Sequence, residues 1–346
     1  MPLQTLRRRL TLALALLMAL SASLFALPAR AAADLARLDY QLAARALAPG
    51  VWVVEGTNAD FSPANGCNII NTGFIATGAG VLVINTGPSK RYGEQLRALI
   101  TRTTPEPVIG VLHLNLHPDY FLGNQAFSDV PRWASPRTRA GMASEFKAYE
   151  DNLYRLCGDW MLGTEALLPD RDLPAAVPGR WWVGGRELEL VELDGHTASD
   201  LVLVDRASQI AFVGGLVFVQ RIPTTPHARV APWLASLERL QRLASEQRWH
   251  TLVPSHGPVL TAGGAQGDGV HDAVGAGIDQ TRAYLRWLDT SFSLWARQGW
   301  EMSDVLRAAL PAPFRSWAAV QTEFVRNVAH LYPVYERAAM ASGGPR

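Results

Sequence analysis

The feature that most constrains this chain is a histidine-bearing loop that follows an apolar run. The β-branched stretch Val108–Leu114 predicts a buried strand, and Tyr120–Phe127 begins a short helix. Between them the chain passes through His117 and Asp119. Because α/β proteins place their chemistry in the loops beyond strand ends, this loop predicts a functional site.

Two other predicted strands also end in a histidine. Glu187–Leu193 leads to His196 in a Gly-His-Thr sequence, and Thr251–Val253 leads to His256 in a Ser-His-Gly sequence. Taken singly, each histidine is more typical of a structural or surface position. Together with His117, in strand-end loops that contain Gly or Pro, they predict one convergent site.

The surroundings of these histidines resemble the metallo-β-lactamase superfamily, whose signature is His-x-His-x-Asp-His followed by Gly-Asn. Further motifs are similar to those of the quinoprotein relay system zinc metallohydrolases, exported proteins associated with pyrroloquinoline-quinone-dependent alcohol oxidation. The similarity extends from Tyr40 to Glu336. The motifs that carry it are Asn71–Phe74, Asn85–Ser89, Phe121–Phe127, Tyr284–Asp289, Glu323–Arg326 and His330–Pro333.

The resemblance implies an α/β fold, a four-layer αββα sandwich with a helical carboxyl-terminal extension. It places a metallo-β-lactamase-like domain at residues 40–262 and the extension, packed on that domain, at residues 270–340. The order of the predicted elements agrees. Strands are grouped first, strands and helices then alternate, and helices close the chain, which favours two sheets with helices outside.

The resemblance also implies a zinc site, from which this chain departs. Intact sites bind one zinc ion through three histidines, here at Asn115, His117 and His196, and a second through Asp119, the histidine position now occupied by Tyr120, and His256. A bridging acid belongs at Gly215 and a supporting aspartate at Asn85. The degenerate positions are therefore Asn85, Asn115, Tyr120 and Gly215. We expect no ordinary dinuclear centre, because loss of even an outer partner costs about 10–100-fold in metal affinity.

Two hypotheses remain for this site. In the first, one zinc ion is held by His117, Asp119, His196 and His256, and hydrolysis of a small molecule uses a metal-bound water. Asp119 and Tyr120 would then be catalytic, and Asn115 would contact the substrate. In the second, no metal binds, and the protein is a pseudoenzyme that binds a ligand or a partner. The loss of carboxylates fits the second hypothesis, because clustered acids repel without a cation.

Two more histidines have an open role. His227 lies in the Pro-rich segment Pro223–Pro232, a candidate lip over the pocket, and could contact the substrate; a surface histidine is the alternative. His113 precedes Asn115 on the same strand face and could replace the missing ligand; a buried structural histidine is the alternative.

The amino terminus has the pattern of a signal peptide over residues 1–33. Arg7–Arg9 form a basic region, Leu10–Leu20 is apolar, and small residues around Ala31 predict cleavage; an uncleaved anchor is the alternative. The run of arginines weakly resembles a twin-arginine signal. We therefore expect a periplasmic protein without stable membrane insertion. In that compartment the two cysteines, Cys67 and Cys157, can form a disulfide or remain buried thiols.

The charge balance limits the expected partners. The formal net charge is +1, which argues against nucleic acid as a partner. We expect a small-molecule ligand, and the resemblance adds a periplasmic quinoprotein dehydrogenase as a possible protein partner.

Overall fold

The computed structural model describes residues 37–174, 176–262 and 273–341. The predicted signal peptide, residues 1–33, lies outside these ranges. Contacts between residues divide the chain into two units, Met1–Asp39 and Tyr40–Arg346. Among the described helices, none combines the length and the apolar character needed to cross a bilayer.

The first sheet has the strand order β1-β2-β3-β4-β5-β6. Most neighbours are antiparallel, but β4 pairs parallel with β5, and β5 with β6. The helix α2 makes the crossover between β4 and β5. The strands are β1 Arg45–Ala48, β2 Val51–Val54, β3 Thr72–Ala76, β4 Val81–Ile84, β5 Val108–Leu112 and β6 Arg132–Trp133.

The second sheet has the order β12-β11-β10-β9-β8-β7. Its one parallel pair among the described strands is β10 with β11, and α5 makes that crossover. The strands are β7 Gly179–Val183, β8 Arg186–Leu193, β9 Asp200–Asp205, β10 Ile210–Phe212, β11 Thr251–Val253 and β12 Leu260–Thr261.

Helix α2 packs on the first sheet and α5 on the second, and helices α6 to α9 come after the last strand of the chain. Ser89 caps α2 by accepting a hydrogen bond from the Tyr92 backbone, and Ser135 caps α4 in the same way. The helices are α2 Lys90–Thr103, α3 Pro118–Phe121, α4 Pro136–Cys157, α5 Val230–Gln247, α6 Ala273–Arg297, α7 Met302–Val305, α8 Ala312–Arg315 and α9 Val320–Ala341. Short 3-10 helices are η2 Asn124–Phe127, η3 Gly158–Met161 and η4 Gly214–Leu216.

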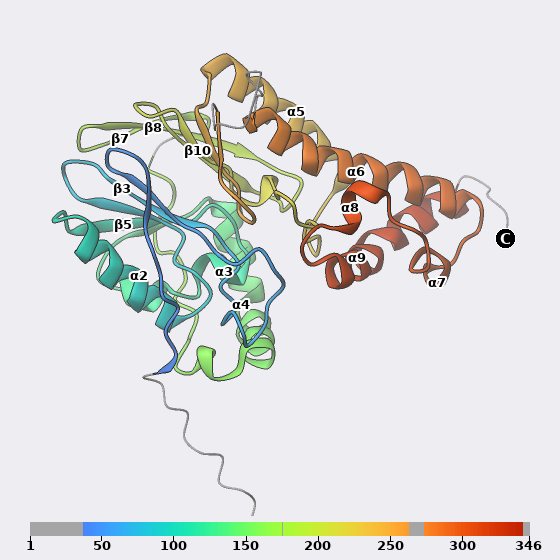
Figure 1. The fold of residues 1–346 in the computed structure, drawn as a ribbon, viewed down its shortest axis with the longest axis horizontal. Coiled ribbons are helices and arrows are strands. Elements are labelled where there is room, and N and C mark those ends of the chain that lie inside the picture. The colour runs from blue at the N-terminus through green and yellow to red at the C-terminus, as the bar shows by residue number, and fades with distance from the viewer. Residues whose placement is uncertain (1–36, 175, 263–272, 342–346) are drawn as a thin grey trace, which may run out of the picture. The chain divides into compact units, whose positions relative to one another are not determined.

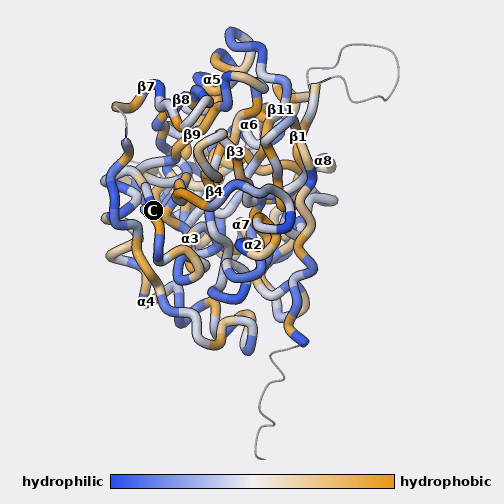
Figure 2. Tube along the Cα trace, turned by 90° about the vertical axis from the view of Figure 1, so that its left-hand side faces the viewer, coloured by the Kyte–Doolittle hydropathy of each residue, from blue (hydrophilic) through white to orange (hydrophobic). Residues whose placement is uncertain are grey.

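The core is layered as the sequence predicts. Apolar residues of both sheets, such as Ile84 and Leu203, pack between them in one cluster. A second cluster joins the first sheet to α2, and a third joins the second sheet to α5, α6 and α9 (Figure 1). Figure 2 shows the hydrophobic residues concentrated along the strands. The four-layer sandwich and its helical carboxyl-terminal region are confirmed.

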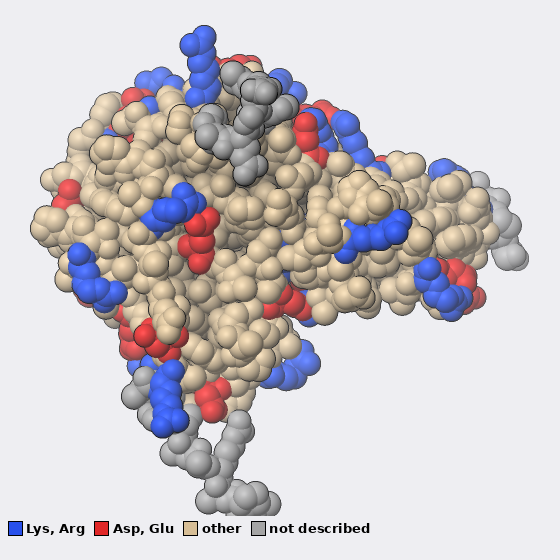
Figure 3. Space-filling view, viewed as in Figure 1, with Lys and Arg blue, Asp and Glu red and all other residues tan. Residues whose placement is uncertain are grey.

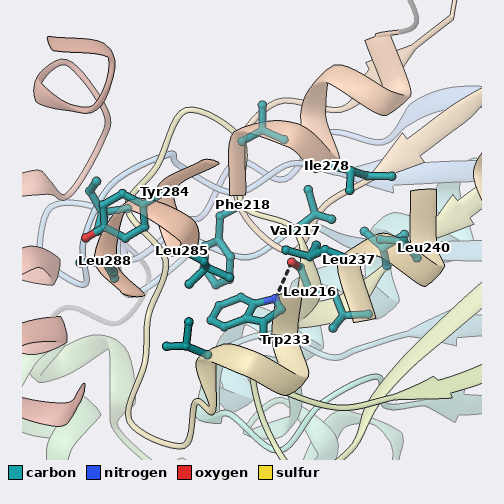
Figure 4. Packing of buried hydrophobic residues seen from close by; sticks show 14 of the residues in the cluster. Leu216, Val217, Phe218, Trp233, Leu237, Leu240, Ile278, Tyr284, Leu285 and Leu288 are labelled. Atoms are coloured by element: carbon teal, nitrogen blue, oxygen red, sulfur yellow. Dashed lines mark hydrogen bonds between the residues drawn. The ribbon is translucent and has the colours of Figure 1, made fainter. Parts of the chain in front are cut away.

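The carboxyl-terminal helices are attached to the second sheet through Trp233 of α5. The indole lies beside Phe218, in one cluster with Leu285 and Leu288, and its Nε1 donates to the Leu216 carbonyl at 2.9 Å (Figure 4). Burial of so large an aromatic side chain contributes several kcal/mol of apolar stabilisation, at about 25 cal/mol per Å². The helical region therefore shares one core with the sheet that carries His196.

The β-branched residues within Asn68–Asn71 are typical of a strand, but the structure forms none there. The segment is irregular, and its last residue bonds to another loop: the Asn71 backbone donates to the Ser255 carbonyl at 2.8 Å, and its side chain donates to the Pro254 and Gly257 carbonyls. Strands β1, β7 and β12 have no clear strand pattern in the sequence, because each is short and has an exposed or half-buried face.

A disulfide joins Cys67 to Cys157, with the two Cα atoms 5.9 Å apart. It ties the loop before β3 to the end of α4, so the open question of the cysteine pair is answered by the fold. On the surface, acidic and basic side chains are interspersed on the face in Figure 3.

Candidate functional site

The three predicted histidines lie in loops at the same edge of the sandwich. His117 follows β5, His196 follows β8 and His256 follows β11, and all three are buried. The ring centroids of His117 and His196 are 4.8 Å apart. Phe218 lies between His256 and His196, with its ring centroid 5.1 Å from that of His256 and 5.5 Å from that of His196. Asp119 joins the group, because its Oδ2 is 3.6 Å from His256 Nε2.

His196 belongs to a dense hydrogen-bond network, which we call the His196 side of the site: His196, Asp200, Asn115 and Thr197. Asp200 Oδ1 is 3.0 Å from His196 Nδ1, and a carboxylate only accepts, so Nδ1 carries the proton. Asn115 donates to Asp200 and to Thr197, and its own carbonyl accepts from the His117 backbone at 3.0 Å. The network fixes the His196 ring so that Nε2 faces away from Asp200.

Gly215 leaves room for this arrangement. A Cβ at Gly215 would lie 1.9 Å from His196 Nδ1 and 3.0 Å from Asp200 Oδ1. The imidazole therefore occupies the space that a side chain at position 215 would need. The bridging acid that the resemblance places here could not coexist with this position of His196.

The other half of the site, the Asp119 side, is built around a buried cation: Asp119, His256, Arg221 and Glu323. Arg221 is 1% exposed, and its guanidinium lies 3.7 Å from Glu323 of α9. Arg326 extends the ion pair to Asp60, with contacts of 2.8 Å to Glu323 and 2.9 Å to Asp60. The guanidinium also lies over the Phe218 ring at 5.8 Å. The carboxyl-terminal helix thus holds a positive charge under the site.

Burial controls protonation in this site. It lowers the pKa of His117 well below its usual value, and the neighbouring His196 lowers it further. Burial likewise lowers the pKa of His256, with Arg221 adding to the effect. For Asp119, burial raises the pKa to about 6, although Arg221 opposes the shift. The two rings are therefore uncharged near neutral pH.

Several buried polar atoms in the site lack a partner. His117 Nε2, His196 Nε2 and Asp119 Oδ2 accept or donate no hydrogen bond. Imidazole and carboxylate are donors that zinc accepts. Within the described ranges, however, no group of three His, Cys, Asp or Glu side chains is arranged to hold a metal ion. The chemical types of these side chains would suit one zinc ion, but their positions in the structure are not grouped around a common point.

The remaining predicted positions take structural contacts. Asn85 has a positive φ of 58° and accepts from the Leu114 backbone at 3.0 Å, which supports the start of the His117 loop. Tyr120 is buried, and burial beside Asp119 raises the pKa of its phenol well above the usual value. His113 Nδ1 lies 3.2 Å from the Tyr120 carbonyl, and burial lowers its pKa to about 3. His113 thus holds the loop backbone.

His227 lies close to His117. Its ring centroid is 5.4 Å from that of His117, and its Nε2 is 3.2 Å from the Tyr149 hydroxyl of α4. Burial lowers the pKa of His227, so the ring is neutral at pH 7.

Sequence reasoning missed Asp200 and Arg221. Asp200 had a signal, since it lies only four residues after His196, at the start of β9. Arg221 had none, because its partner Glu323 is distant in sequence and only the fold brings them together.

Comparison with known protein families identifies the superfamily of this chain. The model of the metallo-beta-lactamase superfamily matches residues 65–256, more than half of the chain. The chain belongs to the metallo-beta-lactamase superfamily. The match contains His117 and His196 and ends at His256.

Individual members of the superfamily are distant from this chain. The acyl-coenzyme A thioesterase MBLAC2 of Gallus gallus is 21% identical over 222 residues, covering 60% of this chain and 71% of its own. Among solved structures, a metallo-beta-lactamase from Pontibacter korlensis is 22% identical with a TM-score of 0.54, covering 71% of this chain and 99% of its own. The enzyme from Hirschia baltica is 17% identical, with a TM-score of 0.52 and coverages of 70% and 97%. The mono-zinc form of FIM-1 from Pseudomonas aeruginosa is 15% identical, with a TM-score of 0.53 and coverages of 71% and 95%. These structures share the fold.

Proposed function

We propose that the chain is an exported, hydrolase-like protein of the quinoprotein relay type. In this proposal its pocket takes a small molecule and holds at most one metal ion. The observation that carries the proposal is the set of buried atoms without partners, His117 Nε2, His196 Nε2 and Asp119 Oδ2. An unsatisfied buried polar group costs about 1–3 kcal/mol, so a ligand that contacts these atoms is bound favourably.

Metal-dependent hydrolysis is the first form of the proposal. His117, Asp119, His196 and His256 are the ligand types that zinc prefers, and the Asp200 contact orients His196 as carboxylates orient metal-binding histidines. Zinc in such sites supplies a water of lowered pKa. Thioesters belong among the first compounds to screen, because the curated relative is named an acyl-coenzyme A thioesterase.

A metal-free binding protein is the second form. Two observations favour it: the ligand-type side chains are not arranged around one point within the described residues, and His196 fills the space beside Gly215. In this form Tyr120 and Asn115 are packing residues of the pocket. A small-molecule ligand or a periplasmic quinoprotein dehydrogenase binds there without turnover.

Export rests on the sequence pattern of residues 1–33. The Cys67–Cys157 disulfide supports it, because disulfides persist in oxidising compartments such as the periplasm.

Elemental analysis of the mature protein, purified without chelator and again after zinc or iron is offered, separates the two forms. One ion per chain that is lost in His196→Ala and kept in the control His250→Ala supports the hydrolase; His250 is exposed and contacts Thr251 instead. No retained metal under either condition excludes the hydrolase and leaves the binding protein. Two ions per chain would overturn the proposal as a whole.

A further inference from the structure

A cavity of about 570 Å³ opens next to the candidate site. His227 forms part of its wall, and the same ring lies 5.4 Å from that of His117, so the cavity borders the site. Small-molecule sites commonly have volumes of about 300–1,000 Å³. The lining residues are Leu116, Arg137, Ala140, Gly141, Ser144, Glu145, Ala198, His227 and Arg229.

One face of α4 forms a long wall of this cavity. Its lining residues recur at helical spacing, from Arg137 through Ala140, Gly141 and Ser144 to Glu145. The middle of the wall is small and apolar. Leu116 faces it, since a Cβ at Gly141 would lie 2.9 Å from the Leu116 side chain. The middle of the cavity therefore suits an apolar molecular body.

The two ends of the same wall carry opposite charges. Arg137 and Glu145 are eight residues apart, which corresponds to about 12 Å along a helix. Within the described part of the chain Arg137 forms no ion pair; its guanidinium donates to the Ala198 carbonyl at 3.5 Å. Arg229, by contrast, pairs with Asp194. An anionic group would be attracted to Arg137, and Glu145 disfavours it at the other end.

The position of Arg137 in α4 adds to this attraction. It lies in the first turn of a 22-residue helix, where the backbone dipole favours negative charge. His227 adds no charge, because burial lowers its pKa.

We propose that this cavity binds a small molecule with an apolar body and one anionic group of the carboxylate or sulfonate kind, and that Arg137 contacts the anionic group. The inference rests on the proposed function in one respect, because it places the reactive part of the ligand beside His117. Binding itself requires neither a metal ion nor turnover, so its test is independent of metal content.

A matched pair of fluorescent probes tests the charge. 1-Anilinonaphthalene-8-sulfonate and N-phenyl-1-naphthylamine share their rings, and the first carries a sulfonate. Both are titrated into the mature protein in the presence of chelator. A charge-assisted contact contributes about 1.5–3 kcal/mol, so Arg137→Ala should weaken sulfonate binding about tenfold or more and leave the neutral probe unchanged. The control Arg139→Ala, on the same helix and paired with Asp172, should change neither.

A second variant tests the location. Ala140→Phe fills the cavity from an exposed position and should weaken both probes, whereas Ala148→Phe, exposed on the same helix outside the lining, should weaken neither. The proposal is overturned if the unmodified protein binds neither probe, if Arg137→Ala leaves sulfonate binding unchanged, or if Ala140→Phe affects neither probe. Any of these outcomes leaves the metal analysis, and with it the proposed function, untouched.

Discussion

The two halves of the site contrast in how they satisfy buried polar groups. On the His196 side, Asp200, Asn115 and Thr197 exchange short hydrogen bonds, and the ring is held from its Nδ1. On the Asp119 side, Oδ2 has no hydrogen bond and a buried ion pair lies beneath. The contrast teaches that one half depends on hydrogen bonds between two neighbouring loops, and the other on an ion pair whose acidic partner comes from the carboxyl-terminal helix.

The largest effect should come from breaking the ion pair. Glu323→Gln leaves Arg221 buried without its nearest carboxylate, and removal of one partner from a buried pair typically costs about 3–5 kcal/mol. Urea unfolding measures the loss. The matched control is Glu238→Gln, which removes an exposed pair with Arg286 and should cost at most about 1 kcal/mol. Equal losses in the two variants would mean that Arg221 is hydrated or otherwise paired.

A smaller effect is expected from crowding the His196 side. In Gly215→Ala the new methyl group meets the His196 ring, and overpacking costs about 1–3 kcal/mol. The control Gly185→Ala has its nearest atom 3.7 Å away and should change stability by less than about 0.5 kcal/mol. Thermal unfolding compares them. An unchanged midpoint for Gly215→Ala would show that His196 moves freely.

Asp200→Asn tests the hydrogen-bond network of the His196 side without adding volume. It weakens the contact to His196 while keeping the shape, and a charged hydrogen bond contributes about 1.5–3 kcal/mol, part of which the amide oxygen retains. We expect a loss of about 1 kcal/mol in urea unfolding, together with a changed His196 ring signal in NMR. A ring signal identical to that of the unmodified protein would contradict the network.

The last expected effect is a pH dependence on the Asp119 side. Its pKa of about 6 in the folded state exceeds the ordinary 3.8, so the folded state binds the proton more tightly. The resulting stability is fully present below about pH 4 and is lost as the pH rises through 6. In the presence of chelator, Asp119→Asn should remove a negative slope of at most about 1.4 kcal/mol per pH unit between these values. Parallel pH profiles of the two proteins would refute the shift.

Much of the fold was predictable because its signals are local. Apolar runs such as Val81–Ile84 and Val108–Leu112 define buried strands, and helical periodicity defines α5 and α6. Edge strands such as β7 escaped prediction, since an exposed face weakens the pattern. The segment Asn68–Asn71 resembles a strand in sequence but forms none, because the Asn71 side chain bonds to the His256 loop instead.

The sequence by itself determined the superfamily fold and the three loops that meet at the site, because each histidine directly follows a strand in its own motif. The tertiary structure decided which contacts the side chains of those loops make. The disulfide, the Arg221–Glu323 pair and the contact between His196 and the space at Gly215 each join residues from different elements. Such contacts depend on distances across the packed molecule, and no local pattern of residues encodes them.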